Sequence, residues 1–131
     1  MVRESWSPDE LKIVEYLRFR GHHVERLEPT ADHGVPTADA LVDNVETEFK
    51  SLQSNESRES RGEPPASVNS LINAAHRSER QADVVVIDVR NVPLSSADAE
   101  EALRRLKGSP QISSEQVRFI GNGFDIAGGV R

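Results

Sequence analysis

The sequence predicts an α/β fold in which helices flank a mixed sheet, with the element order α-β-β-β-α-β-α-β-β. Apolar residues recur at helical spacing within residues 7–20. Residues 82–90 are rich in valine and isoleucine, which is typical of a strand buried on both faces of a sheet. Between these segments, residues 37–50 alternate like two short strands joined by a turn. We expect one domain over residues 1–131, because this length buries about two-thirds of the unfolded surface.

Composition narrows the possible functions. The chain has no cysteine, which excludes disulfides and thiolate metal sites. We expect no membrane span, since no apolar run approaches about 18 residues, and the N-terminus does not resemble a signal peptide. The net charge of −6 opposes generic polyanion binding. A nucleic-acid enzyme of this charge would need a local basic stripe and bound cations.

The first helix is predicted over residues 7–20. Residues 7–10 read Ser-Pro-Asp-Glu, a capping box with proline at the first helical position, and a glycine follows the helix. Trp6 and Leu11 have the spacing of a hydrophobic staple. Glu15 lies among the apolar positions of this helix, so it is either partly shielded from water or an ordinary solvent-facing glutamate.

The hairpin carries the chemistry that we consider most informative. A two-residue turn at Asp43 and Asn44 would set Asp39 directly opposite Glu48. Lys50 would share a strand face with Glu48, because side chains alternate along a strand. Like charges facing each other across a ladder are destabilising, so a divalent cation between them is the simplest explanation. Glu46 also shares this face but pairs one step further along, and we rank it below Glu48.

Mg²⁺, or Mn²⁺ in its stead, prefers oxygen ligands and usually binds through one or two carboxylates together with substrate phosphates. We therefore expect Asp39, Glu48 and the backbone carbonyl of Phe49 to hold the metal. Lys50 could then orient or deprotonate the attacking water, or stabilise the transition state as a point charge. The alternative is a surface salt-bridge cluster of the two acids and the lysine.

The remaining elements are predicted from amino-acid composition and from the spacing of apolar residues. Residues 22–28 are predicted as a strand and residues 29–36 as a loop. Residues 51–67 are predicted as a long exposed loop, either a lid whose arginines reach a polyanion or a disordered segment. A helix begins at Val68, another covers residues 95–107, and strands are expected at 116–120 and 124–126, with the final glycines fraying into the tail.

The helix from Val68 has a polar stripe that could contact a nucleic-acid backbone, or could be an ordinary solvated face. Arg90 ends the buried strand predicted over residues 82–90, near where an open α/β sheet would have a site. The candidate substrate-binding residues are Asn73, Arg77, Arg80 and Arg90.

These motifs resemble the PD-(D/E)xK (restriction-endonuclease-like) nuclease superfamily, whose core is α-β-β-β-α-β. The matching residues are Pro36, three positions before Asp39, and the run from Glu48 to Lys50. Residues 37–52 and 81–90, with a glycine-rich end after residue 120, are similar to the C-terminal tRNase toxin domain of the contact-dependent growth inhibition protein CdiA. That resemblance implies a further catalytic acid on the first helix, which would be Glu15, a tRNA substrate, Mg²⁺ or a similar cation, and a cognate immunity protein.

The sequence thus predicts a metal-dependent nuclease toxin domain that hydrolyses phosphodiester bonds, with tRNA as the expected substrate. Its catalytic residues would be Asp39, Glu48, Lys50 and Glu15. The alternatives are a DNA endonuclease of the same superfamily and a non-catalytic immunity or regulatory module, which the acidic charge favours. We expect a monomer without membrane contact that acts in the bacterial cytoplasm after delivery from a secreted or surface parent protein.

Overall fold

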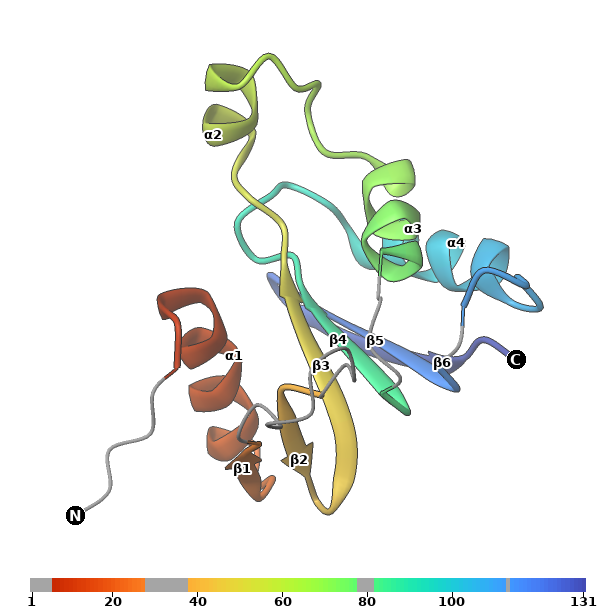
Figure 1. Ribbon diagram of the computed structural model, residues 1–131. Helices are drawn as coiled ribbons and strands as arrows, with labels where there is room; N and C mark the ends of the chain where they lie inside the picture. The colour runs from red at the N-terminus through yellow and green to blue at the C-terminus, as the bar shows by residue number, and fades with distance from the viewer. Residues whose placement is uncertain (1–5, 28–37, 78–81, 113) are drawn as a thin grey trace, which may run out of the picture.

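A computed structural model describes residues 6–27, 38–77, 82–112 and 114–131, and its centre is a six-stranded mixed sheet (Figure 1). The strands follow the chain in spatial order β1-β2-β3-β4-β5-β6. Both β3–β4 and β4–β5 pair in parallel, and the other neighbours are antiparallel. The mixed α/β fold predicted from the sequence is confirmed. The strands are β1 (Val24–Arg26), β2 (Ala40–Val42), β3 (Val45–Ser51), β4 (Val84–Asp88), β5 (Gln116–Gly121) and β6 (Phe124–Gly129).

Helices cover the two faces of this sheet unequally. Figure 1 shows α1 on one face, α3 and α4 together on the other, and α2 standing beyond the end of β3. Within the described residues, no helix is long and apolar enough to cross a membrane. The helices are α1 (Pro8–Phe19), α2 (Asn55–Ser60), α3 (Val68–His76) and α4 (Ser96–Leu106).

The first helix forms as predicted, and its N-terminal end docks on the sheet through Trp6. Ser7 Oγ accepts from the Glu10 N–H and Glu10 returns a carboxylate oxygen to the Ser7 N–H, which completes the capping box. The staple expected between Trp6 and Leu11 stays a prediction. Leu11 is 40% exposed, whereas the Trp6 ring lies 5.9 Å from the ring of Phe49 on β3. This contact fixes the N-terminal end of α1 against the strand that carries the candidate site.

The core forms two layers because β4 is apolar on both faces. Val86 packs with the buried residues of α1, such as Leu17, on one face. Val85 and Ile87 face α3 and α4 on the other, where Phe119 of β5 is fully buried. A β-branched strand in the middle of a sheet is expected to be buried in this way.

The hairpin has the predicted turn and register. Asp43 and Asn44 have φ values of 50° and 68°, the left-handed conformation that a type I′ turn requires at both central residues. Val42 pairs with Val45, and Ala40, the first residue of β2, pairs with Thr47. The strand β3 therefore continues for four residues past its last pairing with β2. That edge of β3 is where the candidate site lies.

Three boundary predictions need correction. Residues 51–67 are not only an exposed loop, because β3 includes Ser51 and α2 lies within the segment. The Ala66 N–H donates to Asn55 Oδ1 at 2.8 Å, which closes the segment on itself. The final glycines do not fray: Gly128 and Gly129 belong to β6 and pair with β5. The first strand covers only Val24–Arg26, and the loop predicted at 29–36 lies outside the described residues.

Candidate active site

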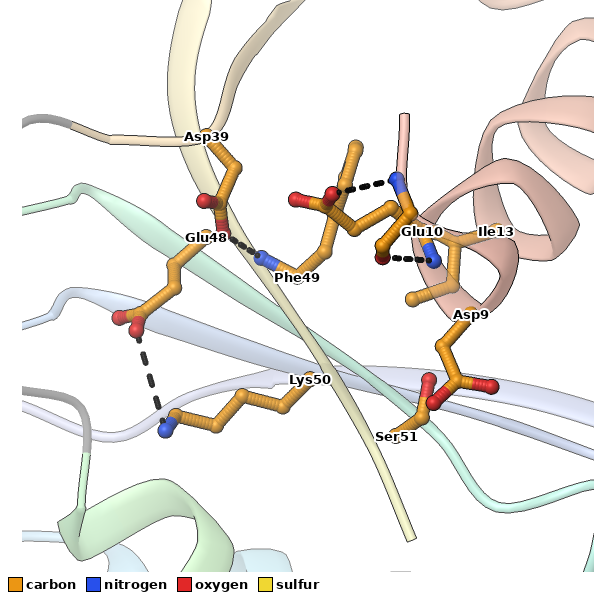
Figure 2. A pocket seen from close by; sticks show the side chains of 9 residues that line it. Asp9, Glu10, Ile13, Asp39, Glu48, Phe49, Lys50 and Ser51 are labelled. Atoms are coloured by element: carbon orange, nitrogen blue, oxygen red, sulfur yellow. Dashed lines mark hydrogen bonds and ion pairs between the residues drawn. The ribbon is translucent and has the colours of Figure 1, made fainter. Parts of the chain in front are cut away.

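A pocket of about 350 Å³ lies at the edge of β3 that β2 leaves uncovered (Figure 2). We call it the acidic pocket, because four of its residues are carboxylates. It contains all four hairpin residues that the sequence selected. Its lining residues are Ser7, Asp9, Glu10, Ile13, Asp39, Glu48, Phe49, Lys50 and Ser51.

Asp39 is held against the backbone of β3. Its Oδ2 accepts a hydrogen bond of 2.8 Å from the Phe49 N–H. In an antiparallel ladder, the N–H and C=O of one residue point toward the same neighbouring strand. The Phe49 carbonyl therefore faces the same open edge as the Asp39 carboxylate, as the predicted metal site requires.

Glu48 is a buried carboxylate, with 6% of its surface exposed, and it shares a sheet face with its register partner Val85. Burial of a charged group is costly unless that group is paired and hydrogen-bonded. Lys50 supplies part of that compensation, because its Nζ lies 3.8 Å from Glu48 Oε1. Glu46, by contrast, is exposed and does not line the pocket. The preference for Glu48 over Glu46 agrees with this geometry.

Lys50 also contacts the end of α3. Its Nζ donates to the backbone carbonyl of Arg77 at 3.2 Å, and Arg77 is the C-cap of α3. Cations near the C-terminus of a helix are favoured by the unsatisfied carbonyls there. The lysine side chain is 24% exposed, so its ammonium group is positioned by acceptors while remaining accessible from solvent.

The structure does not bring Glu15 to the acidic pocket. Glu15 is exposed on α1, and the helix instead contributes Asp9 and Glu10 from its first turn. The reason is the docking of α1 by Trp6 on Phe49, which brings the start of the helix, not its middle, to β3. The capping box could have suggested these two acids, but nothing in the sequence shows which turn of the helix meets the sheet.

The donor set suits a hard divalent cation held partly by substrate and water. Two hairpin carboxylates and one edge carbonyl supply only oxygen atoms, which Mg²⁺ and Mn²⁺ accept. Across the described residues, no group of three or more His, Asp or Glu side chains is gathered closely enough to enclose a metal. A site built from one or two carboxylates is nevertheless the usual arrangement for Mg²⁺ at a phosphate.

A second pocket, also about 350 Å³, adjoins the first. Lys50 and Ser51 line both pockets, so the two meet at the end of β3. We call it the basic pocket. It is lined by Lys50, Ser51, Leu52, Gln53, Arg58, Arg61, Glu63, Ala74 and Arg77.

The four candidate substrate-binding residues divide between several locations. Arg77 lines the basic pocket. Asn73 is exposed one turn earlier on α3 but lines neither pocket, and Arg80 lies outside the described residues. Arg90 lines neither of these two pockets, and its contact with substrate stays a prediction.

Arg90 instead has a structural role on the α1 face. Its guanidinium forms a two-pronged pair with the buried carboxylate of Asp88, with both N···O distances at 2.9 Å, and also donates to the Lys12 carbonyl. It lies 5.1 Å from the centre of the Tyr16 ring. The hydrogen bond to Asp88 raises the pKa of Arg90. These contacts join α1 to the end of β4.

A polar network on the same face was missed by the sequence analysis. Asp125 accepts hydrogen bonds of 2.7 Å from both the Tyr16 hydroxyl and Arg118 Nε. Arg118 also approaches His22, whose Nδ1 lies 2.6 Å from the Asp43 carboxylate in the hairpin turn. The network therefore links α1, β5, β6 and the hairpin turn, and we interpret it as structural.

The sequence profile of the family described as the contact-dependent growth inhibition CdiA C-terminal domain matches residues 36–126. The chain belongs to this family. The match runs from the start of the hairpin to the middle of β6, so it includes three of the four predicted catalytic residues and excludes α1. The chain is thus a CdiA C-terminal toxin domain, and domains of this family are delivered from a surface parent protein.

A solved structure supports the fold of this CdiA C-terminal domain. It is described as the CdiA-CT/CdiI toxin and immunity complex from Burkholderia pseudomallei and superposes with a TM-score of 0.52 at 14% sequence identity. The alignment covers 98% of this chain and 94% of that one. No curated protein sequence matches the chain. At this identity the similarity establishes the fold alone.

Proposed function

We propose that this CdiA C-terminal domain is a metal-dependent nuclease of the PD-(D/E)xK type that hydrolyses a phosphodiester bond, with tRNA as its substrate. The observation that carries the proposal is the gathering of Asp39, Glu48, the Phe49 carbonyl and Lys50 in one pocket. The hairpin register and the open edge of β3 bring these groups together from distinct positions along the chain. A surface salt-bridge cluster does not explain why Glu48 is buried beside the pocket.

The donor set fits Mg²⁺ or Mn²⁺, held by the two hairpin carboxylates and the Phe49 carbonyl. Such an ion, when bound, lowers the pKa of a coordinated water and offsets charge on the phosphate. The protein contributes the fixed geometry. Asp39 is oriented by the Phe49 N–H, and Glu48 is held by burial and by Lys50. Both carboxylates are therefore oriented before substrate arrives, which reduces the reorganisation needed during the reaction.

Lys50 is the residue that acts on the substrate directly. Its ammonium group lies between the acidic pocket and the end of α3, where Glu48 and the Arg77 carbonyl hold it. In this position it stabilises negative charge that develops on the phosphate, or positions the attacking water. A point charge of this kind acts strongly only where water is partly excluded, and the 24% exposure of the side chain meets that condition.

The choice of tRNA rests on the similarity to CdiA tRNase domains, because a carboxylate and lysine site does not distinguish ribose from deoxyribose. A DNA endonuclease with the same residues is the second candidate. Incubating the purified domain with tRNA and, separately, with duplex DNA distinguishes them. We expect tRNA fragments and intact duplex, whereas cleavage of the duplex alone would assign the domain to the second candidate.

We further propose a cognate immunity protein as partner and the cytoplasm of a target bacterium as the site of action. The relative from Burkholderia pseudomallei was solved as a toxin and immunity complex, which supports a partner of this kind. The earlier alternative, that this chain is itself an immunity or regulatory module, is disfavoured by membership of a toxin-domain family.

Growth after expression in a bacterium tests the proposal in cells. We expect arrest with the wild-type chain and normal growth with Asp39→Ala. Asp98→Ala, which alters a capping carboxylate on α4 far along the chain from the pocket, serves as the control and should still arrest growth. If Asp39→Ala arrests growth as strongly as the wild-type chain at equal protein levels, the assignment of Asp39 is wrong.

A further inference from the structure

We propose that the basic pocket binds phosphate groups of the nucleic-acid backbone next to the bond that is cut. This inference rests on the proposed nuclease function and adds to it a binding site on α2, the loop after it and the end of α3. From the sequence alone, Arg58 and Arg61 belong either to a lid that reaches a polyanion or to a disordered loop. The folded segment gives them a defined location.

The charge of the basic pocket is opposite to that of the whole chain. It is lined by four cationic side chains and one carboxylate, a local charge of +3 in a protein of net charge −6. The cations are Lys50, Arg58, Arg61 and Arg77. A polyanion would be repelled by most of an acidic surface, so a concave group of like positive charges indicates where it can approach.

Arg58 is oriented toward this role by its own hydrogen bonds. Its Nε donates to the Pro64 carbonyl at 2.9 Å, and one terminal nitrogen lies 3.5 Å from Ser70 Oγ. These contacts fix the plane of the guanidinium between α2 and α3 while using only part of its five N–H donors. An arginine fixed in this way loses less conformational entropy on binding a phosphate than a freely rotating one.

Arg61 forms a pair that a phosphate could replace. Its terminal nitrogen lies 2.9 Å from the Glu63 carboxylate, and both side chains are about half exposed. An exposed pair of this kind contributes little to stability. A phosphate with two available oxygens can therefore displace Glu63 at little cost. Glu63 competes with that phosphate for the Arg61 guanidinium and so weakens phosphate binding.

The position of the basic pocket relates it to the chemistry. Lys50 and Ser51 line both pockets. A nucleic-acid strand with one phosphate at Lys50 therefore has its neighbouring phosphates directed toward the acidic pocket on one side and the basic pocket on the other. The acidic pocket favours a bound cation, whereas the basic pocket favours the backbone itself. We infer that the substrate chain runs from the acidic pocket into the basic pocket past Lys50.

Binding in the absence of metal tests the inference separately from cleavage. We would measure the anisotropy of labelled tRNA with the wild-type chain in EDTA over a series of salt concentrations, and repeat it with Arg61→Gln and with Arg58→Gln. Each lost phosphate contact should reduce the slope of log affinity against log salt by about 0.7 to 0.9 and weaken binding several-fold. Glu63→Gln should bind more tightly than the wild-type chain.

The double variant Arg104→Gln/Arg105→Gln is the matched control, because it removes two exposed, paired arginines from α4. It should leave affinity and salt slope close to those of the wild-type chain. Thermal unfolding confirms that each variant is folded, and Arg61→Gln and Glu63→Gln remain decisive if loss of the Pro64 contact unfolds Arg58→Gln.

The outcomes separate this inference from the proposed function. If Arg61→Gln and Glu63→Gln both bind like the wild-type chain while the wild-type chain cleaves tRNA, the basic pocket is not a phosphate site and the nuclease assignment stands. If no nucleic acid is cleaved but binding depends on Arg61 and increases with Glu63→Gln, the pocket binds polyanions and the nuclease assignment is wrong.

Discussion

Asp39 accepts a 2.8 Å hydrogen bond from the backbone N–H of Phe49, which lies on β3 beyond the last residue that pairs with β2. A side chain thus takes the position of the missing strand partner. The same contact satisfies an edge N–H and orients a carboxylate toward the edge where the Phe49 carbonyl lies. The proposed catalytic role of Asp39 and the local stability of the hairpin therefore depend on the same hydrogen bond. Substitutions of Asp39 can separate its effect on activity from its effect on stability.

Substitution of Asp39 should affect activity and stability to different extents. Asp39→Asn keeps an oxygen acceptor for the Phe49 N–H, whereas Asp39→Ala leaves that group without its side-chain partner. We expect Asp39→Ala to cost about 1 kcal/mol more in unfolding free energy than Asp39→Asn. Both should lower tRNA cleavage by at least ~100-fold, since each removes a charged ligand that stabilises the transition state. Urea unfolding and single-turnover cleavage measure the two effects, and retained cleavage by Asp39→Asn would contradict the account.

The pair of Glu48 and Lys50 predicts a compensating double substitution. Lys50→Met retains the apolar stem but leaves the buried Glu48 carboxylate without the nearby ammonium group, at a cost of about 1–2 kcal/mol. Glu48→Gln/Lys50→Met should recover much of that loss, because the neutral amide does not need a cation. A double-mutant cycle by urea unfolding gives the coupling energy. Activity should not recover with stability, and a double variant that cleaves tRNA would contradict the assigned roles.

The network around Asp125 predicts an acid-sensitive contribution to stability. Burial raises the pKa of Asp125, but hydrogen bonds from Arg118 and Tyr16 and the charge of Arg118 outweigh it, so the pKa lies below its ordinary value. A depressed pKa stabilises the folded state above the unfolded-state pKa of about 3.9, and that stabilisation is lost as pH falls through the folded-state value.

We therefore expect Asp125→Asn to be less stable than the wild-type chain at pH 7, by about 2 kcal/mol, with the difference shrinking below roughly pH 4. Urea unfolding at a series of pH values measures this. Glu59→Gln, an exposed carboxylate on α2, is the control and should differ little from the wild-type chain across the range. A constant difference between Asp125→Asn and the wild-type chain down to pH 2 would contradict the argument.

The hairpin turn predicts the effect of substitutions at Asn44, whose φ is 68°. Glycine adopts this conformation without strain, whereas a β-branched side chain pays about 1–2 kcal/mol. Asn44→Gly should match the wild-type chain in thermal stability and Asn44→Val should unfold several degrees lower. Cleavage by Asn44→Gly should be unchanged, because the register between Ala40 and Thr47 is kept. Equal stability of the two variants would show that this turn does not control the hairpin.

Local patterns in the sequence were sufficient for the parts of the site that lie on one hairpin. The turn chemistry of Asp43 and Asn44 determines the register, and the alternation along β3 then separates Glu48 and Lys50 from Phe49. The β-branched composition of β4 likewise predicted a strand buried on both faces. In these cases the deciding interactions are between residues close in sequence.

Features that depend on tertiary contacts were not predictable in the same way. Helix α2 has no buried residue, so its sequence lacks the helical spacing of apolar residues that would predict it. The hydrogen bond from Ala66 N–H to Asn55 Oδ1 helps to close the segment that contains it. The turn of α1 that meets the site depends on the contact between Trp6 and Phe49, which selects Asp9 and Glu10 over Glu15. The contacts of Arg90 were not predictable for a related reason, because its partner Asp88 is buried and the guanidinium also reaches the Lys12 carbonyl of α1.

Metal-dependent cleavage tests the central claim most directly. The purified wild-type chain is incubated with tRNA in Mg²⁺, in EDTA, and in EDTA followed by excess Mg²⁺, beside Lys50→Ala and the Arg104→Gln/Arg105→Gln control. We expect cleavage by the wild-type chain and the control in Mg²⁺, none in EDTA, recovery on adding Mg²⁺ back, and little or none with Lys50→Ala. Cleavage that persists in EDTA and in Lys50→Ala would contradict a metal-dependent nuclease centred on Asp39, Glu48 and Lys50.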